Sequence, residues 1–294
     1  MGILFGLLTA LSWGTADFFA RFSTRKIGTF RTMLYMQLLG FVLLTLAMPS
    51  LGGWGHLTDG SGWRPWLWGI VAGALNTSST LALYRSFEIG KISIVAPLSA
   101  SYPVLTLVLS VTTGERLTLT RIVGIALTIA GVIVVAHGET TSEDAATTGD
   151  GPRPVERRRG IGWALFSAAG FGVMFWLLGI RVVPSLGGAP SVWMIRMTSF
   201  SLTALVILAA RRSLAPPSRK DAHWILGIGA LDTCAYVLNN LGMQREQISV
   251  VSVLASLYGA VTVALAALIL REPVSRLQWL GIGSIFAGIF LISR

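Results

Sequence analysis

The chain has 294 residues, of which 53% are hydrophobic and only 12% are charged. Soluble domains carry about twice that charged fraction, so the composition excludes a water-soluble globular protein. The formal net charge of +10 does not indicate nucleic acid as a partner, because the basic residues do not alternate with aromatic residues along one polar surface.

Apolar stretches long enough to cross a bilayer follow one another along the chain. About 20 helical residues cross the hydrocarbon, and these stretches lack the period-two alternation of a barrel strand. We therefore predict an all-α integral membrane protein with ten transmembrane helices at 2–21, 30–48, 66–86, 92–112, 120–137, 160–180, 190–210, 222–243, 248–270 and 275–293.

Basic residues alternate between the two sides of the membrane. The connections after the odd-numbered helices hold sixteen Lys and Arg residues, and the opposite side holds six. By the positive-inside rule the richer side faces the cytoplasm, which places both termini outside. We expect a multi-pass protein of the cell inner (plasma) membrane, with the lipid bilayer as its surroundings.

A polar segment divides the chain into two halves. Residues 138–159 are rich in Gly, Pro, Ser and Thr and carry mixed charges, a composition typical of linkers. We predict a first repeat at 1–137 and a second at 160–294, with five helices each. An odd number of helices makes the second repeat enter the membrane from the opposite side, and inverted repeats place a substrate site in a central cavity near the midplane.

The last two helices of each half resemble one another. Glu115, Gly124 and Gly131 meet Glu272, Gly281 and Gly288 at one constant offset. In each half the two glycines are seven residues apart and lie on one helix face, which lets helices approach closely. We interpret this face as scaffold or as a dimer surface, so both a monomer and a homodimer are compatible with it.

Several motifs resemble the EamA domain of the drug/metabolite transporter superfamily. They are the Trp13-Gly14 pair, the ALYRSFEIGKISIVAPL segment that begins at Ala82, the Gly-Glu-Arg-Leu hinge at 114–117 and the Gly124/Gly131 spacing. The second half departs from the pattern, since Phe171 stands in place of Trp13 and its hinge reads Arg-Glu-Pro. The resemblance implies ten helices and transport of a small metabolite.

Two charged residues inside predicted helices are the main candidates for substrate binding. Asp232 lies near the middle of its helix and Arg196 about two turns into another, where a charge costs about 2.5–3.5 kcal/mol on insertion scales. Asp232 would contact an ammonium group or carry a coupling proton, and Arg196 would clasp a carboxylate or phosphate. The alternative is that the two residues form a buried ion pair, and a substrate could compete for either partner of such a pair. Tyr35 is the expected counterpart of Arg196 in the first half.

The other candidates are polar or aromatic residues within helices. Asp17 is a possible coupling residue, although Arg21 at i+4 would make it a simple interfacial ion pair. Cavity lining or helix packing explains the remaining predicted substrate-binding residues: Trp13, Asn76, Tyr102, Asn239 and Tyr258.

Two helices are expected to act as paired gates or to hold fixed kinks. Pro97 and Pro103 each remove a backbone hydrogen bond from the helix over 92–112. The helix over 248–270 has no proline but contains Gly259 beside Tyr258.

The sequence does not support catalysis. It contains no phosphate-binding loop of the G-x-x-x-x-G-K-[ST] type, no metal-ligand spacing and no evident nucleophile–base pair. We therefore expect a non-enzyme without cofactors or metals. The predicted function is outward transport of a small polar metabolite, such as an amino acid, by alternating access. The alternatives are export of lipophilic or cationic drug-like compounds, and a membrane-embedded enzyme or ligand-binding receptor.

Overall fold

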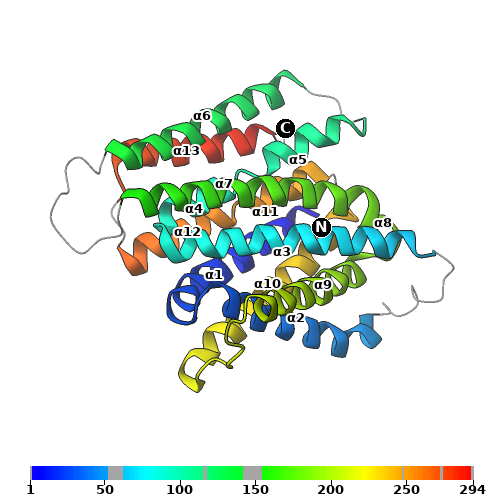
Figure 1. The fold of residues 1–294 in the computed structure, drawn as a ribbon. Coiled ribbons are helices and arrows are strands. Elements are labelled where there is room, and N and C mark those ends of the chain that lie inside the picture. Colours follow the sequence, from blue (N-terminus) through cyan, green and yellow to red (C-terminus); the bar gives the residue numbers. More distant parts are fainter. Residues whose placement is uncertain are drawn as a thin grey trace.

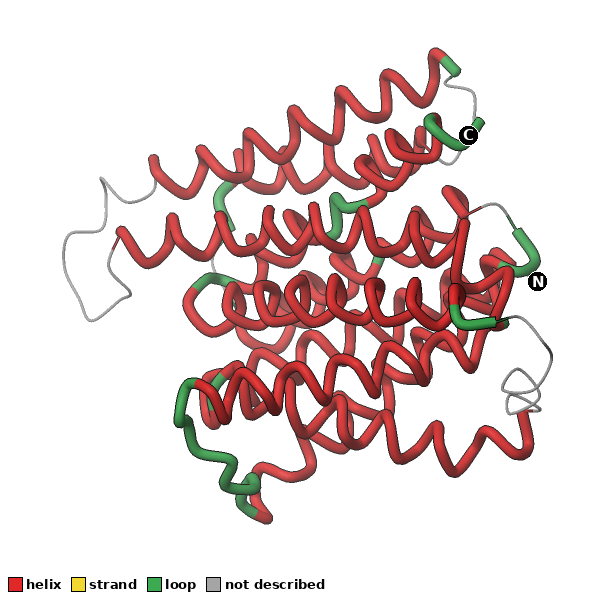
Figure 2. The backbone as a smooth tube through the Cα atoms, turned by 45° about the vertical axis from the view of Figure 1, so that its right-hand side comes forward, coloured by secondary structure: helices red, strands yellow, loops and turns green. Residues whose placement is uncertain are grey.

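The computed structural model describes residues 2–51, 62–114, 118–141, 154–246, 248–271 and 274–292, and within these it contains helices and no strands (Figures 1 and 2). The helices are α1 (Gly2–Ile27), α2 (Thr29–Leu51), α3 (Arg64–Ile89), α4 (Ile92–Ser99), α5 (Pro103–Val111), α6 (Leu119–Thr141), α7 (Pro154–Leu177), α8 (Val183–Leu186), α9 (Gly188–Ala209), α10 (Arg219–Met243), α11 (Ile248–Ser256), α12 (Tyr258–Leu265) and α13 (Arg276–Ile292). Two π-helical turns, Leu178–Val182 and Ala266–Leu270, follow α7 and α12.

These elements form ten helical spans in the described part of the chain, because α4 and α5, α7 and α8, and α11 and α12 each make one span. Five spans are long and apolar enough to cross a membrane by length and composition: Thr29–Leu51, Ile92–Val111, Gly160–Leu186, Gly188–Ala209 and Val251–Leu270. Leu119–Val134 and Arg276–Ile292 are apolar but shorter. The remaining long helices, α1, α3 and α10, carry more polar residues, and all three reach the pocket described below.

The helices at the joint extend further than the composition predicted. α6 continues to Thr141 and α7 begins at Pro154, so both enter the segment 138–159 that was predicted as linker. Residues 142–153, which make up most of the predicted linker, lie outside the described residues. So do the predicted hinge residues Glu115 and Glu272.

Each half packs mainly on the other half. α1 packs on α10, α3 on α7, α2 on α9, and α6 on α13. α1 and α7 are the first spans of the two halves, and α3 and α10 are the third spans. Exchanging the halves therefore turns the α1–α10 contact into the α3–α7 contact, while the α2–α9 and α6–α13 contacts map onto themselves. This is the contact pattern of two five-helix repeats related by a pseudo-two-fold axis, so the core of the molecule lies at their interface.

Two equivalent hydrogen bonds repeat this symmetry at the level of single side chains. Thr106 Oγ1 in α5 donates to the carbonyl oxygen of Gly172 in α7 at 3.1 Å. Thr262 Oγ1 in α12 donates to the carbonyl oxygen of Gly14 in α1, also at 3.1 Å. Each threonine follows a tyrosine by four residues, and each glycine follows an aromatic residue. The repeat is therefore preserved in contacts that the sequence comparison did not reveal.

The fourth and ninth spans are both broken near their middle. α4 ends at Ser99, and α5 begins at Pro103, which has no N–H to continue the helix. Pro97 lies inside α4 and not at the break. The ninth span is interrupted at Leu257 without a proline.

The two broken spans touch beside their breaks. A Cβ on Gly259 in α12 would lie 2.7 Å from the Cβ of Ala100, closer than real Cβ atoms approach. Glycine is therefore required for α12 to pack on the end of α4.

The glycine faces of the fifth and tenth spans pack on each other inside one chain. A Cβ added at Gly131 in α6 would lie 2.7 Å from the carbonyl oxygen of Gly281 in α13, and one at Gly124 would lie 2.7 Å from that of Gly288. α6 and α13 lie side by side at one edge of the molecule (Figure 1). The suggestion that these glycines form a dimer surface is therefore wrong, because they are covered by the partner repeat.

Substitution of Gly131 by Ala should lower the thermal stability of the detergent-solubilised protein, because the added methyl group meets backbone in α13. Overpacking of this kind costs about 1–3 kcal/mol. Gly283→Ala on α13 is the matched control, since a Cβ there meets no atom within 4 Å. Thermal unfolding followed by size-exclusion chromatography measures both, and equal stability of the two variants would contradict this packing.

Candidate functional site

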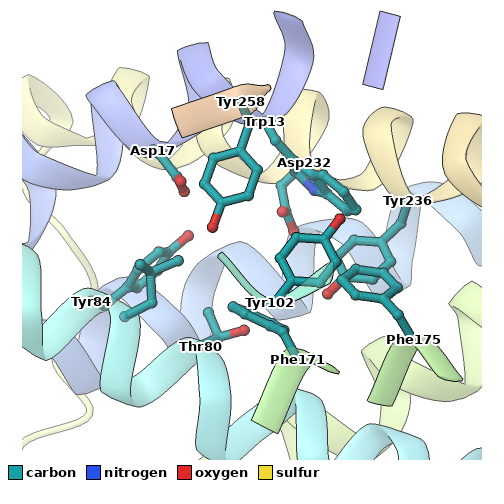
Figure 3. Close-up of a pocket in the computed structure, with 11 residues that line it drawn as sticks. Trp13, Asp17, Thr80, Tyr84, Tyr102, Phe171, Phe175, Asp232, Tyr236 and Tyr258 are labelled. Carbon is teal, nitrogen blue, oxygen red and sulfur yellow. The ribbon is translucent and has the colours of Figure 1, made fainter. Parts of the chain in front are cut away.

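A pocket lies between the two repeats, with about 380 Å³ of empty space including its open mouth. It is called the central pocket here, and Figure 3 shows its side chains converging on a common space. Residues from α1, α3, α7, α10, α12 and the junction of α4 and α5 line it: Trp13, Asp17, Thr80, Leu83, Tyr84, Tyr102, Phe171, Phe175, Asp232, Tyr236 and Tyr258. Both repeats therefore contribute to one cavity.

Aromatic rings form most of the wall. Trp13 makes edge contacts with Tyr236 and Tyr258, with ring centroids 4.9 and 6.2 Å apart. Phe175 packs between Trp13, at 5.6 Å, and Tyr102, at 4.9 Å. Such rings present electron-rich faces, which attract cations and apolar groups.

Two of the tyrosine hydroxyls in the wall bind to groups of the broken spans. Tyr102 donates to the carbonyl oxygen of Ser252 at 3.0 Å, and Tyr258 donates to Ser99 Oγ at 3.1 Å. Each tyrosine thus belongs to one broken span and bonds to the other. The wall of the pocket is therefore linked directly to the two breaks.

Two carboxylates face the pocket. Asp17 is only 6% exposed, and within the described part of the chain no hydrogen bond or ion pair reaches it. The expected pair with Arg21 does not form in the structure: Arg21 Nη1 instead donates to the carbonyl oxygens of Phe87 and Gly90. In Figure 3 the Asp17 carboxylate points toward the same space as the hydroxyls of Tyr84 and Tyr258.

The second carboxylate, Asp232, forms an ion pair with Arg196, which is not part of the pocket lining. Arg196 Nη2 lies 2.6 Å from Asp232 Oδ2 as an ion pair, although the angle misses that of a hydrogen bond. Arg196 Nη1 donates to Gln37 Oε1 at 2.7 Å, and its guanidinium lies 4.9 Å from the ring centre of Tyr236. Arg196 is fully buried and is absent from the pocket lining. The structure favours the buried-pair interpretation of Arg196 over direct contact with substrate.

Asn76 lies behind the wall and supports it. The Tyr236 hydroxyl donates to Asn76 Oδ1 at 2.5 Å, and Asn76 Nδ2 donates to Ser199 Oγ at 3.0 Å. Asn76 is fully buried and was expected to line the cavity. Its amide instead fixes the position of Tyr236, which does line the cavity.

Asn239 and Tyr35 are also displaced from the expected positions. Asn239 is fully buried one turn beyond Tyr236, where its Nδ2 lies 3.7 Å from Met243 Sδ. Tyr35 is half-buried in a surface groove, and its hydroxyl donates to the carbonyl oxygen of Leu214 at 2.5 Å. Aligning 33–40 with 193–200 pairs Arg196 with Met36 and not with Tyr35. One residue turns a helical side chain by about 100°, which accounts for the misplacement of Tyr35.

Five of the predicted residues do line the pocket: Trp13, Asp17, Tyr102, Asp232 and Tyr258. Their role in binding substrate stays a prediction. Thr80 and Tyr84 also line the pocket but were not among the predicted site residues, although their spacing of four and eight residues from Asn76 places them on one helical stripe. Gln37, the buried partner of Arg196, was not predicted either, although it is a polar residue inside an apolar span.

The model of the EamA-like transporter family matches the chain twice, at residues 1–136 and 158–294. The chain belongs to the EamA-like transporter family. This EamA-like transporter is 31% identical to the uncharacterized protein MJ1333.1 of Methanocaldococcus jannaschii over 135 residues, which are 46% of this chain and 95% of that protein. The relative therefore has about the length of one repeat.

A solved crystal structure shares the fold of this EamA-like transporter with a TM-score of 0.71. The match covers 99% of this chain and 95% of the solved chain, at 18% sequence identity.

The buried pair predicts strong coupling between its two members. Arg196→Met and Asp232→Asn should each lower thermal stability, because removing one partner of a buried ion pair leaves the other charge uncompensated, at a cost of about 3–5 kcal/mol. The double variant should lose less than the sum of the single variants. Melting temperatures of the four proteins in detergent measure this, and strictly additive losses would show that the two residues do not form a pair.

Proposed function

We propose that this EamA-like membrane transporter carries a small organic amine, a molecule with an ammonium group on an apolar or aromatic body. The observation that carries the proposal is the central pocket, whose aromatic wall presents two carboxylates and, among its described lining residues, no basic side chain. Outward direction and location in the inner membrane are part of the proposal and follow the family resemblance and the charge pattern.

The charges of the site favour a cation. Asp232 is compensated by Arg196 at 2.6 Å, whereas Asp17 has no such partner in the described structure. A buried carboxylate without a cation is costly inside a membrane, so the site is completed by a bound ammonium group or by a proton. The faces of Trp13, Tyr84 and Tyr258 would contribute cation–π attraction, which favours quaternary and primary ammonium groups alike.

An amino acid is the second candidate, and the position of Arg196 favours the amine over it. A zwitterion also needs a donor for its carboxylate, and Arg196 is the residue first predicted to supply it. In the structure this guanidinium is already bound by Asp232 and Gln37. An amino acid would therefore have to break that pair, whereas an amine needs only Asp17. The geometry supports the amine.

Alternating access would use the two broken spans. Tyr102 and Tyr258 belong to these spans and stand in the pocket wall, and each bonds to the opposite span. Loss of one such bond would let one half of a broken span move while the other half stays packed. Pro103 and Gly259 beside the breaks, together with Pro97 within α4, are the residues proposed to permit this gating.

Phenethylamine, phenylalanine and phenylacetate separate the candidate substrates, because they share a phenyl ring and differ in charge. Phenethylamine should bind purified protein most tightly, and Asp17→Asn should weaken its binding about tenfold to a hundredfold, since a hydrogen bond to a charged group contributes about 1.5–3 kcal/mol. Intrinsic tryptophan fluorescence measures binding. Asp221→Asn, the same change at the surface end of α10, should have no effect.

Flux of labelled phenethylamine into sealed proteoliposomes completes this test. A receptor or enzyme would bind or convert the amine without moving it across the bilayer. Tighter binding of phenylalanine than of phenethylamine would overturn the amine proposal and return the function to amino-acid transport.

Proton exchange at Asp17 predicts how the apparent affinity for an amine changes with pH. We expect an amine to displace a proton from Asp17, so that binding in weakly buffered solution acidifies the medium and apparent affinity falls as pH is lowered. Proton release measured with a pH-sensitive dye should disappear in Asp17→Asn. Release of equal size in that variant would assign the proton to another group.

A further inference from the structure

A second cavity lies where α2 begins and α3 and α9 end, and it shares no lining residue with the central pocket. It holds about 770 Å³ of empty space, including its open mouth. It is called the arginine cavity here, after the three arginines among its lining residues: Ile27, Gly28, Thr29, Phe30, Arg31, Arg85, Glu88, Ile207, Arg212 and Ser213. One glutamate stands against the three arginines, so the cavity is positively charged.

Each arginine is held in place by a different contact. Arg31 donates from Nε to the carbonyl oxygen of Ala215 at 2.9 Å and from Nη2 to that of Pro216 at 3.0 Å. The Arg212 guanidinium lies 4.6 Å from the ring centre of Phe30. Arg85 pairs with Glu88 at 2.9 Å. Prepositioned guanidinium groups lose little entropy when they bind an oxyanion.

Two of these arginines, Arg31 and Arg212, lack a carboxylate partner in the described part of the chain. Glu88 is occupied by Arg85 and by the Thr29 hydroxyl, which donates to its Oε2 at 2.7 Å. These features together suit a doubly or singly charged phosphate group, which guanidinium forks bind in bidentate fashion.

The predicted topology places the cavity near the level of the lipid headgroups. It is formed by the ends of three predicted membrane spans, on the side where the chain carries sixteen basic residues against six on the other. Anionic phospholipids attract basic groups at this level, and basic pockets between transmembrane helices bind their headgroups.

From these observations we infer that the arginine cavity is a phosphate-binding site, filled in the membrane by the headgroup of an anionic phospholipid. This site is separate from the central pocket and does not depend on which substrate is carried. Arg31 would bring the bound phosphate next to the 213–218 connection, whose carbonyl groups it already holds.

Native mass spectrometry with mixed phosphatidylglycerol and phosphatidylcholine tests the inference on the full chain. The wild-type protein should retain phosphatidylglycerol in preference to phosphatidylcholine. The triple variant Arg31→Gln, Arg85→Gln, Arg212→Gln should lose that preference. Arg219→Gln, which removes one exposed charge nearby without touching the cavity, should keep it. Phe30→Leu, which leaves every charge in place but removes the ring under Arg212, should reduce the preference in part.

A thermal-stability assay separates lipid from free phosphate. Inorganic phosphate is compared with chloride at equal ionic strength, in wild type and in the single variant Arg212→Gln, which is expected to fold. Stabilisation of wild type alone by phosphate would support the site and identify a soluble anion as a competing occupant. An unchanged phosphatidylglycerol preference in both the triple variant and Arg212→Gln would overturn the inference, as would the absence of any preference in wild type.

Discussion

Hydrocarbon offers no partner to a buried polar group, and this constraint organises the molecule. The charged side chains inside the spans must therefore pair within the protein or be completed by a bound group. Arg196 and Asp232 do so across α9 and α10, and Gln37 from the opposite repeat completes the arginine's contacts. The helices that carry most of the polar residues, α1, α3 and α10, therefore turn toward the interface between the repeats. The central pocket is the place where their polar faces meet.

Duplication explains why this interface can be a binding site. Every span finds its main contact in the other repeat, so neither repeat buries its own polar face. The pair of hydrogen bonds from Thr106 and Thr262 to Gly172 and Gly14 shows the same geometry used twice. Trp13 and Phe171, which precede these glycines, break the symmetry chemically: one can donate a hydrogen bond and the other cannot. A symmetric scaffold thus encloses an asymmetric pocket, with Asp17 on one side only.

Much of the architecture could be predicted from sequence because it depends on local properties. Apolar runs of membrane-spanning length, the alternation of basic residues and the repeated glycines indicated ten spans in two inverted halves. Site residues were harder to predict. Asp232, Asp17, Trp13, Tyr102 and Tyr258 stood out as polar or aromatic residues inside spans, and they do line the pocket. Asn76 and Asn239 satisfied the same criterion and lie behind it, because a helical polar residue can face either a cavity or a neighbouring helix.

The amino-acid sequence by itself determined the class of protein and the family, because hydrophobic length and repeat spacing are properties of the chain. Only the tertiary structure shows which charged side chains inside the spans pair with each other. From sequence Arg196 was a candidate both for binding a carboxylate and for pairing with Asp232, and the structure places its guanidinium between Asp232 and Gln37. The seven-residue glycine spacing permitted either a dimer or an internal contact until α6 was found on α13. Both outcomes depend on how helices distant in sequence are rotated against each other. A shift of one residue turns a side chain by about 100° and changes which neighbour it contacts.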